Sequence, residues 1–142
     1  MIPGEDVDSK YSIDTSDGLV RVQIWGELRA DGLIKLMGRI AADPKHRLDM
    51  AAVVDLREAH GEWDYSEIQR LRDYVARIAT PQSRRWAAIV RPGALVAAAH
   101  VLIVISEPVA GSIRMQLFED APSALRWVKG ARVERDELAG VD

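Results

Sequence analysis

The stretch Arg114-Met-Gln-Leu-Phe-Glu-Asp-Ala-Pro-Ser-Ala-Leu-Arg-Trp-Val128 decides the fold class of this chain, because it predicts a strand, a tight turn and a closing helix. Apolar side chains alternate along its first part, which is typical of a strand with one buried face. Asp120 and Pro122 begin its second part, and both residue types favour the start of a helix. The stretch completes an alternation of strands and helices that begins near Leu19. Such an alternation predicts a largely parallel sheet.

Three earlier strands and an opening hairpin are predicted from the same kind of pattern. Residues 19–25 alternate, and Ser16-Asp17-Gly18 predicts a turn that joins them to a short strand at 11–15. The apolar runs at 50–56 and 86–90 predict strands that are covered on both faces. The sequence therefore predicts an α/β fold with a mixed, mostly parallel sheet of four to five strands and helices packed on it.

Apolar residues at helical spacing predict the intervening helices. One is capped by Asp31, a second is capped by Asp64 or Ser66, and a third spans 94–105. Residues 57–63 predict a polar loop.

Length and composition limit the organisation and the chemistry. The 142 residues predict a flexible arm at 1–10, a single domain at 11–130 and a charged tail at 131–142. A net charge of −3 argues against a nucleic-acid-binding protein. The absence of cysteine excludes disulfides and zinc–cysteine sites, and no nucleotide-binding or hydrolase motif occurs. We therefore expect no cofactor and no bound metal.

Two further observations concern localisation. The first residues lack the basic and then apolar pattern of a signal peptide. The longest apolar run, 94–105, is shorter than the roughly 20 residues that a membrane span needs. We expect a cytoplasmic protein without stable membrane insertion.

Four segments, in this order, carry a resemblance to one known family. Val22-Gln-Ile-Trp-Gly-Glu-Leu28, Val53-Val-Asp-Leu56 and Arg85-Trp-Ala-Ala-Ile-Val90 are similar to successive strands of SpoIIAA-like proteins, and Ala124-Leu-Arg-Trp-Val128 is similar to their closing helix. This family lies in the wider anti-sigma-factor-antagonist (STAS) and CRAL-TRIO lipid-exchange superfamily. The resemblance implies a four- or five-stranded mixed sheet with helices packed on it, and it implies no settled activity.

The start of the second helix is where anti-sigma antagonists carry an Asp-Ser-Ser-Gly-Leu motif, whose serine a kinase phosphorylates. Here the corresponding residues are Asp64-Tyr65-Ser66-Glu67-Ile68, so that Asp64 and Ser66 fit while Glu67 replaces the glycine. Ser66 is either a phosphorylation switch at the positive end of a helix or, with Asp64, simply a cap.

The loop before this helix, 60–64, follows the central strand at the edge where open α/β folds bind ligands. His60, Glu62 and Asp64 could bind a metal or act as acid and base, or they could be solvated loop residues. Trp63 either folds back as a lid on the core or stands exposed as a binding anchor.

Arginines flank the strand at 86–90. Arg84, Arg85 and Arg91 could form an anion site with Arg57. Solvation at strand ends explains them equally well.

The predicted helix 94–105 is apolar on nearly every face, although a surface helix should have a polar side. It forms a dimer interface, lines an apolar ligand pocket with Leu95, Ala98 and Leu102, or is partly a strand. The dimer interface is the favoured interpretation, and His100 is then a satisfied interface or core side chain.

The sequence therefore favours a bacterial, non-enzymatic regulatory or protein-interaction module of the STAS type, dimeric, with a partner-binding surface at Trp63, Asp64, Tyr65 and Ser66. The alternative is a protein that binds a lipid or another apolar small molecule. A third hypothesis is an enzyme that uses His60, Glu62 and Asp64.

Overall fold

A single five-stranded sheet organises the computed structural model, which describes residues 7–139 and the side chains of residues 7–130. The strands lie in chain order, namely β1 (Asp8–Asp14), β2 (Leu19–Glu27), β3 (Ala51–His60), β4 (Arg84–Ile89) and β5 (Ile113–Phe118). The pair β1–β2 is antiparallel, and the other three pairs are parallel. This arrangement confirms the predicted mixed, mostly parallel sheet.

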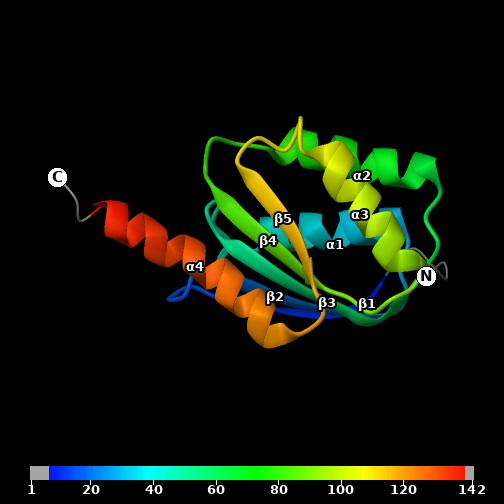
Figure 1. The fold of residues 1–142 in the computed structure, drawn as a ribbon, viewed down its shortest axis with the longest axis horizontal. Helices are drawn as coiled ribbons and strands as arrows, with labels where there is room; N and C mark the ends of the chain where they lie inside the picture. Colours follow the sequence, from blue (N-terminus) through cyan, green and yellow to red (C-terminus); the bar gives the residue numbers. More distant parts are fainter. Residues whose placement is uncertain (1–6, 140–142) are drawn as a thin grey trace.

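The helices lie on both faces of the sheet but are unequally shared. Figure 1 shows α1 (Ala30–Ala42), α2 (Tyr65–Ile78) and α3 (Ala94–Ser106) on one face and α4 (Ala121–Ala139) on the other. Parallel strands added in one direction through right-handed crossovers place successive helices on the same face. The helix α4 follows the last strand and is free of that constraint.

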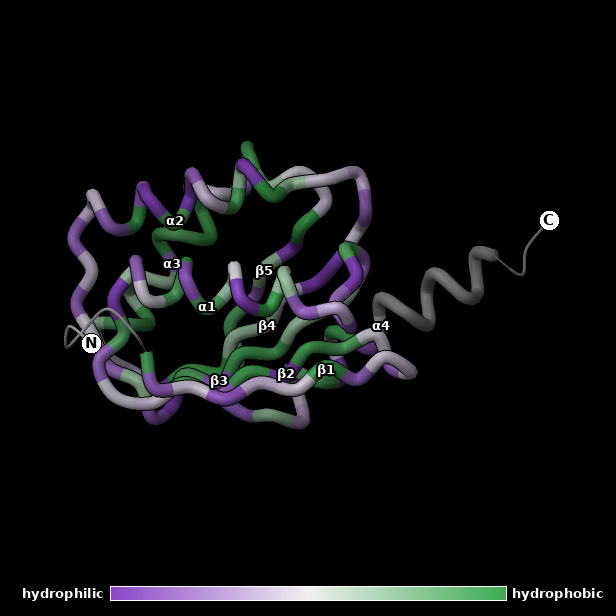
Figure 2. The backbone as a smooth tube through the Cα atoms, turned by 180° about the vertical axis from the view of Figure 1, so that it is seen from behind, coloured by the Kyte–Doolittle hydropathy of each residue, from purple (hydrophilic) through white to green (hydrophobic). Residues whose placement is uncertain are grey.

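Two layers of apolar side chains fill the space on either face of the sheet. Ile24, Leu28 and Leu36 belong to the larger core, beneath α1, α2 and α3. Val53 and Ala124 belong to the smaller one, beneath α4. In Figure 2 the central strands are largely green, whereas α2 alternates between purple and green, as expected for an amphipathic helix. The prediction that β3 is covered on both faces is confirmed.

Several element boundaries differ from the predicted ones. Asp8 pairs with Trp25, so the predicted arm at 1–10 ends too late, and its residues 1–6 lie outside the described part. The strand β3 continues to His60, into the predicted loop 57–63, because it keeps pairing with the extended β2. The backbone of residues 131–139 is helical and continues α4, where the sequence predicted a charged tail.

The sequence predicted the N-caps of α1 and α2, and the structure has the predicted cap only at α2. Asp64 is the N-cap of α2 and forms a reciprocal capping box with Glu67. Asp31 is not the cap of α1, because the N-cap is Arg29, without a side-chain hydrogen bond, and Asp31 lies in the first turn. An acidic side chain there still interacts favourably with the helix dipole.

Candidate functional site

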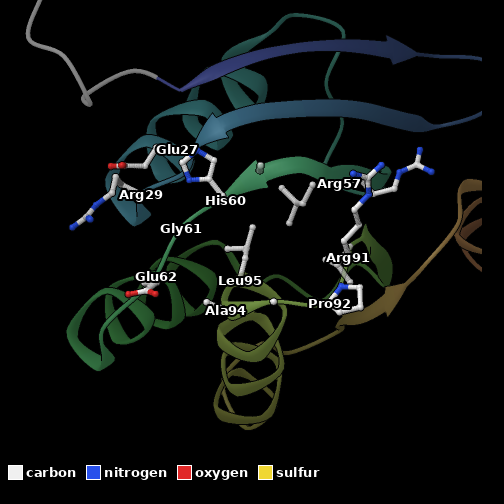
Figure 3. Close-up of a pocket in the computed structure, with 14 residues that line it drawn as sticks. Glu27, Arg29, Arg57, His60, Gly61, Glu62, Arg91, Pro92, Ala94 and Leu95 are labelled. Atoms are coloured by element: carbon white, nitrogen blue, oxygen red, sulfur yellow. The ribbon is translucent and has the colours of Figure 1, made fainter.

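A pocket of about 720 Å³ lies at the carboxyl ends of β2, β3 and β4. Its walls come from the last residues of these strands, the loops that follow them and the first turn of α3 (Figure 3). Open α/β folds bind ligands at this edge of the sheet. We therefore treat this carboxyl-edge pocket as the candidate functional site.

The charged side chains of the pocket fall into two groups. Figure 3 shows Arg57 and Arg91 on one side, and Glu27, Arg29 and His60 on the other. Each arginine of the first group lies beside a carboxylate, since Arg57 Nη2 is 2.8 Å from Asp55 Oδ2 and Arg91 Nη2 is 3.4 Å from Glu58 Oε1. A partner would therefore meet ion-paired arginines on this side of the pocket.

A β-bulge fixes the position of Arg57. Gln23 pairs with Asp55 and Trp25 pairs with Glu58, so β3 has one more residue than β2 between these points. The Asp55 carboxylate accepts hydrogen bonds from the Arg57 backbone N at 3.0 Å and from Nε and Nη2 of its side chain at 3.0 and 2.8 Å. These hydrogen bonds with Arg57 hold the pKa of Asp55 below its usual value.

The first turn of α3 forms the floor between these groups. Gly93 is the N-cap, with φ of 153° and no side-chain cap, and both Gly93 and Ala94 line the pocket. A residue with a Cβ rarely adopts this φ. Backbone N–H groups at an uncapped helix start interact favourably with negative charge.

Two loops of the carboxyl edge are tied together at Leu28. The Leu28 N donates to the His60 carbonyl at 2.8 Å, and the indole Nε1 of Trp63 donates to the Leu28 carbonyl at 2.9 Å. A Cβ on Gly61 would lie 2.6 Å from the same carbonyl oxygen, so this approach requires glycine. The half-buried Trp63 also packs on the larger core, which is the lid arrangement of the two that its sequence context allowed.

The start of α2 presents exposed side chains on a rigid base. The Asp64 Oδ1 accepts from the Glu67 N at 2.8 Å, and Glu67 Oε2 accepts from the Asp64 N at 3.3 Å. Glu67 is buried, and its Oε1 lies 3.1 Å from Nη2 of Arg29. Ser66 is exposed, and Tyr65 is 59% exposed. The replacement of the motif glycine by glutamate therefore places a carboxylate inside the fold, where Arg29 balances it.

The three residues of the enzyme hypothesis, His60, Glu62 and Asp64, do not all line the same pocket. His60 and Glu62 line the pocket, whereas Asp64 caps α2 and does not line it. Among the side chains of residues 7–130, no group of three His, Cys, Asp or Glu residues is placed to hold a metal ion.

The three residues predicted to contact an apolar ligand or a second subunit, Leu95, Ala98 and Leu102, lie in different surroundings. Leu95 and Ala98 are buried, and Leu95 contributes to both the larger core and the pocket. Leu102 lines a different, apolar cavity of about 130 Å³ beneath the helices. The exposed side of α3 instead carries His100, Val101 and Val104.

The sequence grouped four arginines as a candidate anion site, and two of them line this pocket. Arg57 and Arg91 do line it together, whereas Arg84 lies at the opposite end of β4 and lines another cavity. Arg85 donates from Nη1 to the Trp127 carbonyl at 2.7 Å, beneath α4. Successive side chains of a strand lie on opposite faces of the sheet, so Arg84 and Arg85 are on opposite faces of β4. This separation could be predicted from their adjacent positions in the sequence. Nothing local to Arg29 indicated its pocket position.

No family model and no curated protein matches the chain. Solved structures do match it. A protein of the DUF3478 family with a SpoIIAA-like fold, from Shewanella loihica PV-4, is 17% identical with a TM-score of 0.54, over 90% of this chain and 99% of that one. An anti-sigma factor antagonist from Mycobacterium paratuberculosis is 17% identical with a TM-score of 0.58, over 91% and 99%.

The chain has the SpoIIAA-like fold. This confirms the fold that the sequence resemblance implied, while the link to CRAL-TRIO lipid exchange stays a prediction. Among the described residues, no helix is both long and apolar enough to cross a membrane.

Proposed function

We propose that this protein is a non-enzymatic regulatory module that binds a partner protein through the start of α2. The observation that carries this proposal is Tyr65, a large side chain that is 59% exposed on a helix start fixed by the Asp64–Glu67 capping box. Tyrosine is enriched among the residues that dominate binding energy at interfaces. A rigid base also lowers the entropy that binding must remove.

The surroundings of Tyr65 support a protein partner. Asp64 and Ser66 flank it and are exposed, and the carboxyl-edge pocket adds polar groups that a partner segment can satisfy. The anti-sigma factor antagonist among the similar structures has a name that implies a protein partner, which agrees with this proposal. Phosphorylation of Ser66 and a cytoplasmic location stay predictions.

Site-specific photocrosslinking in the native host tests the proposal. A photoreactive phenylalanine analogue at position 65 should capture a discrete partner, while the same analogue at the exposed Ala76 of α2 should not. The two positions lie about 16 Å apart along the helix axis. With the captured partner in hand, Tyr65→Ala should weaken binding by about tenfold or more. Equal capture at both positions would contradict the proposal.

We also propose that α3 pairs with a second copy of the chain. Val101 is 42% exposed and Val104 is 67% exposed on this helix. Val104→Asp should shift the mass measured by light scattering from dimer to monomer without a change in the circular dichroism spectrum. A wild-type protein that is monomeric at the highest soluble concentration would contradict the dimer.

A further inference from the structure

A second cavity, of about 160 Å³, lies between the sheet and the helices α1 and α2. It is at the amino ends of the strands, because Val20, Ala52 and Arg84 line it near the beginnings of β2, β3 and β4. Most of its wall is aliphatic, and the exposed Leu48 also contributes to the lining, which gives the cavity a side open to solvent. An engineered cavity of about 150 Å³ is large enough to bind benzene.

Arg84 places a buried positive charge in the wall of this amino-edge cavity. Its residue is only 5% exposed, its Nη2 donates to the Ile78 carbonyl at 2.6 Å, and its guanidinium lies 5.4 Å from the centre of the Trp86 ring. Its Nε has no hydrogen-bond partner, and within the described part of the chain no carboxylate lies within ion-pair distance. Burial lowers the pKa of Arg84, which reflects the unfavourable surroundings of its charge.

The other polar side chains of the cavity do not balance this charge. They are His46 and Tyr74, which have no carboxylate. Burial lowers the pKa of His46 and the charge of Arg84 lowers it further, while Asp43 and Asp49 partly oppose the shift, so that on balance the imidazole favours its neutral form. A buried charge without a counter-ion is costly, and a bound anion would remove most of that cost.

We propose that the amino-edge cavity binds a small amphiphilic carboxylate, with an apolar body about the size of a benzene ring in the cavity and its carboxylate paired with Arg84. The aliphatic wall accounts for the apolar body, and the unpaired guanidinium accounts for the acid group. This site lies at the edge opposite the carboxyl-edge pocket and is independent of the proposed partner surface.

Sodium benzoate and its uncharged relative benzyl alcohol test the proposal on the wild-type protein by chemical-shift perturbation and calorimetry. Benzoate should bind, should perturb the signals of His46, Ala52 and Arg84, and should bind at least about tenfold more tightly than benzyl alcohol. Equal affinity for the two compounds, or no binding of benzoate at millimolar concentration, would overturn the proposal. Competition by sodium chloride at equal concentration would also overturn it, because a simple anion site would then suffice.

Three variants assign the site, and the first two are a matched pair. Arg84→Met should weaken benzoate binding at least about tenfold. Arg21→Met removes the same charge from the exposed face of β2, between the cavity-lining Val20 and Val22, and should leave the affinity unchanged. Ala52→Leu should fill the cavity and abolish binding while Arg84 remains. Should Arg84→Met fail to fold, the comparison of benzoate with benzyl alcohol still decides the proposal.

Discussion

At the carboxyl edge of the sheet, Arg57 forms an ion pair with Asp55, and Arg29 forms one with Glu67. At the amino edge, in contrast, Arg84 is buried with no carboxylate partner among the described residues. The paired arginines are also the more exposed ones, with side chains 35% and 50% accessible. Their carboxylate partners are only 22% and 5% exposed, so each arginine offsets the desolvation of a carboxylate, Asp55 or Glu67. Arg84 has only the Ile78 carbonyl and the Trp86 ring to offset the desolvation of its charge, which makes the amino edge the less favourable electrostatic arrangement.

The largest expected effect is at the carboxyl edge, where Trp63 holds two loops together. Trp63→Ala should lower the free energy of unfolding by about 2–4 kcal/mol, because it removes core packing and leaves the Leu28 carbonyl without its indole donor. Trp63→Phe is the matched control, since it keeps most of the packing and loses the hydrogen bond. Urea unfolding measures both. A fully stable Trp63→Ala would mean that the loops are held by other contacts.

This expectation follows from the inward position of Trp63, which the sequence alone left open as either a lid on the core or an exposed binding anchor. A tryptophan in a polar loop looks the same in the sequence whether it turns inward or outward. The partner of its indole is the carbonyl of Leu28, 35 residues away, and no local pattern specifies that contact. Tyr65 is therefore the better position at which to test partner binding.

The fold was predictable because it depends on order and periodicity. The alternating residues of β2 and β5, and the capping pair Asp64 and Glu67, are local signals that tertiary packing reinforced. The ends of β1 and β3 were not predictable, because polar residues such as Lys10 and Glu58 extend these strands only through pairing with β2. The candidate site was partly predictable, since Arg57 and Arg91 follow neighbouring parallel strands. The burial of Arg84 depends on the helices above it, which a strand pattern does not reveal.

The second prediction compares the same substitution at the two edges. Arg84→Met should raise the free energy of unfolding of the ligand-free protein by about 1–2 kcal/mol, because a buried unpaired charge is replaced by an apolar side chain. Arg57→Met should lower it slightly, because the half-buried Asp55 loses its side-chain donors but keeps the hydrogen bond from the backbone N of residue 57. Thermal and urea unfolding without added anions give both signs. Destabilisation by both substitutions would show that Arg84 has a counter-ion in the free protein.

The smallest effect, and the one that separates the two edges most cleanly, is the pH dependence of these differences. Hydrogen bonds from Arg57 lower the pKa of Asp55 below its ordinary value of 3.8, so the folded state binds this proton less readily than the unfolded state. The stabilisation from the ionised Asp55 is therefore complete above that value and is lost as the pH falls through the lower, folded-state pKa. The stability gap between wild type and Asp55→Asn should shrink as urea midpoints are measured from about pH 5 to about pH 3.

The gap between His46→Gln and the double variant His46→Gln, Arg84→Met should stay nearly constant over the same interval, because an arginine does not titrate there and the coupling of Arg84 to the His46 imidazole has been removed. Tyr74 also lines the cavity, and its phenol stays neutral in this range. A constant gap for Asp55→Asn would show that its pairing with Arg57 orients the bulge without an electrostatic contribution to stability. A gap between these two variants that changes below about pH 5 would instead place an acidic group near the guanidinium, and the contrast between the two edges would no longer hold.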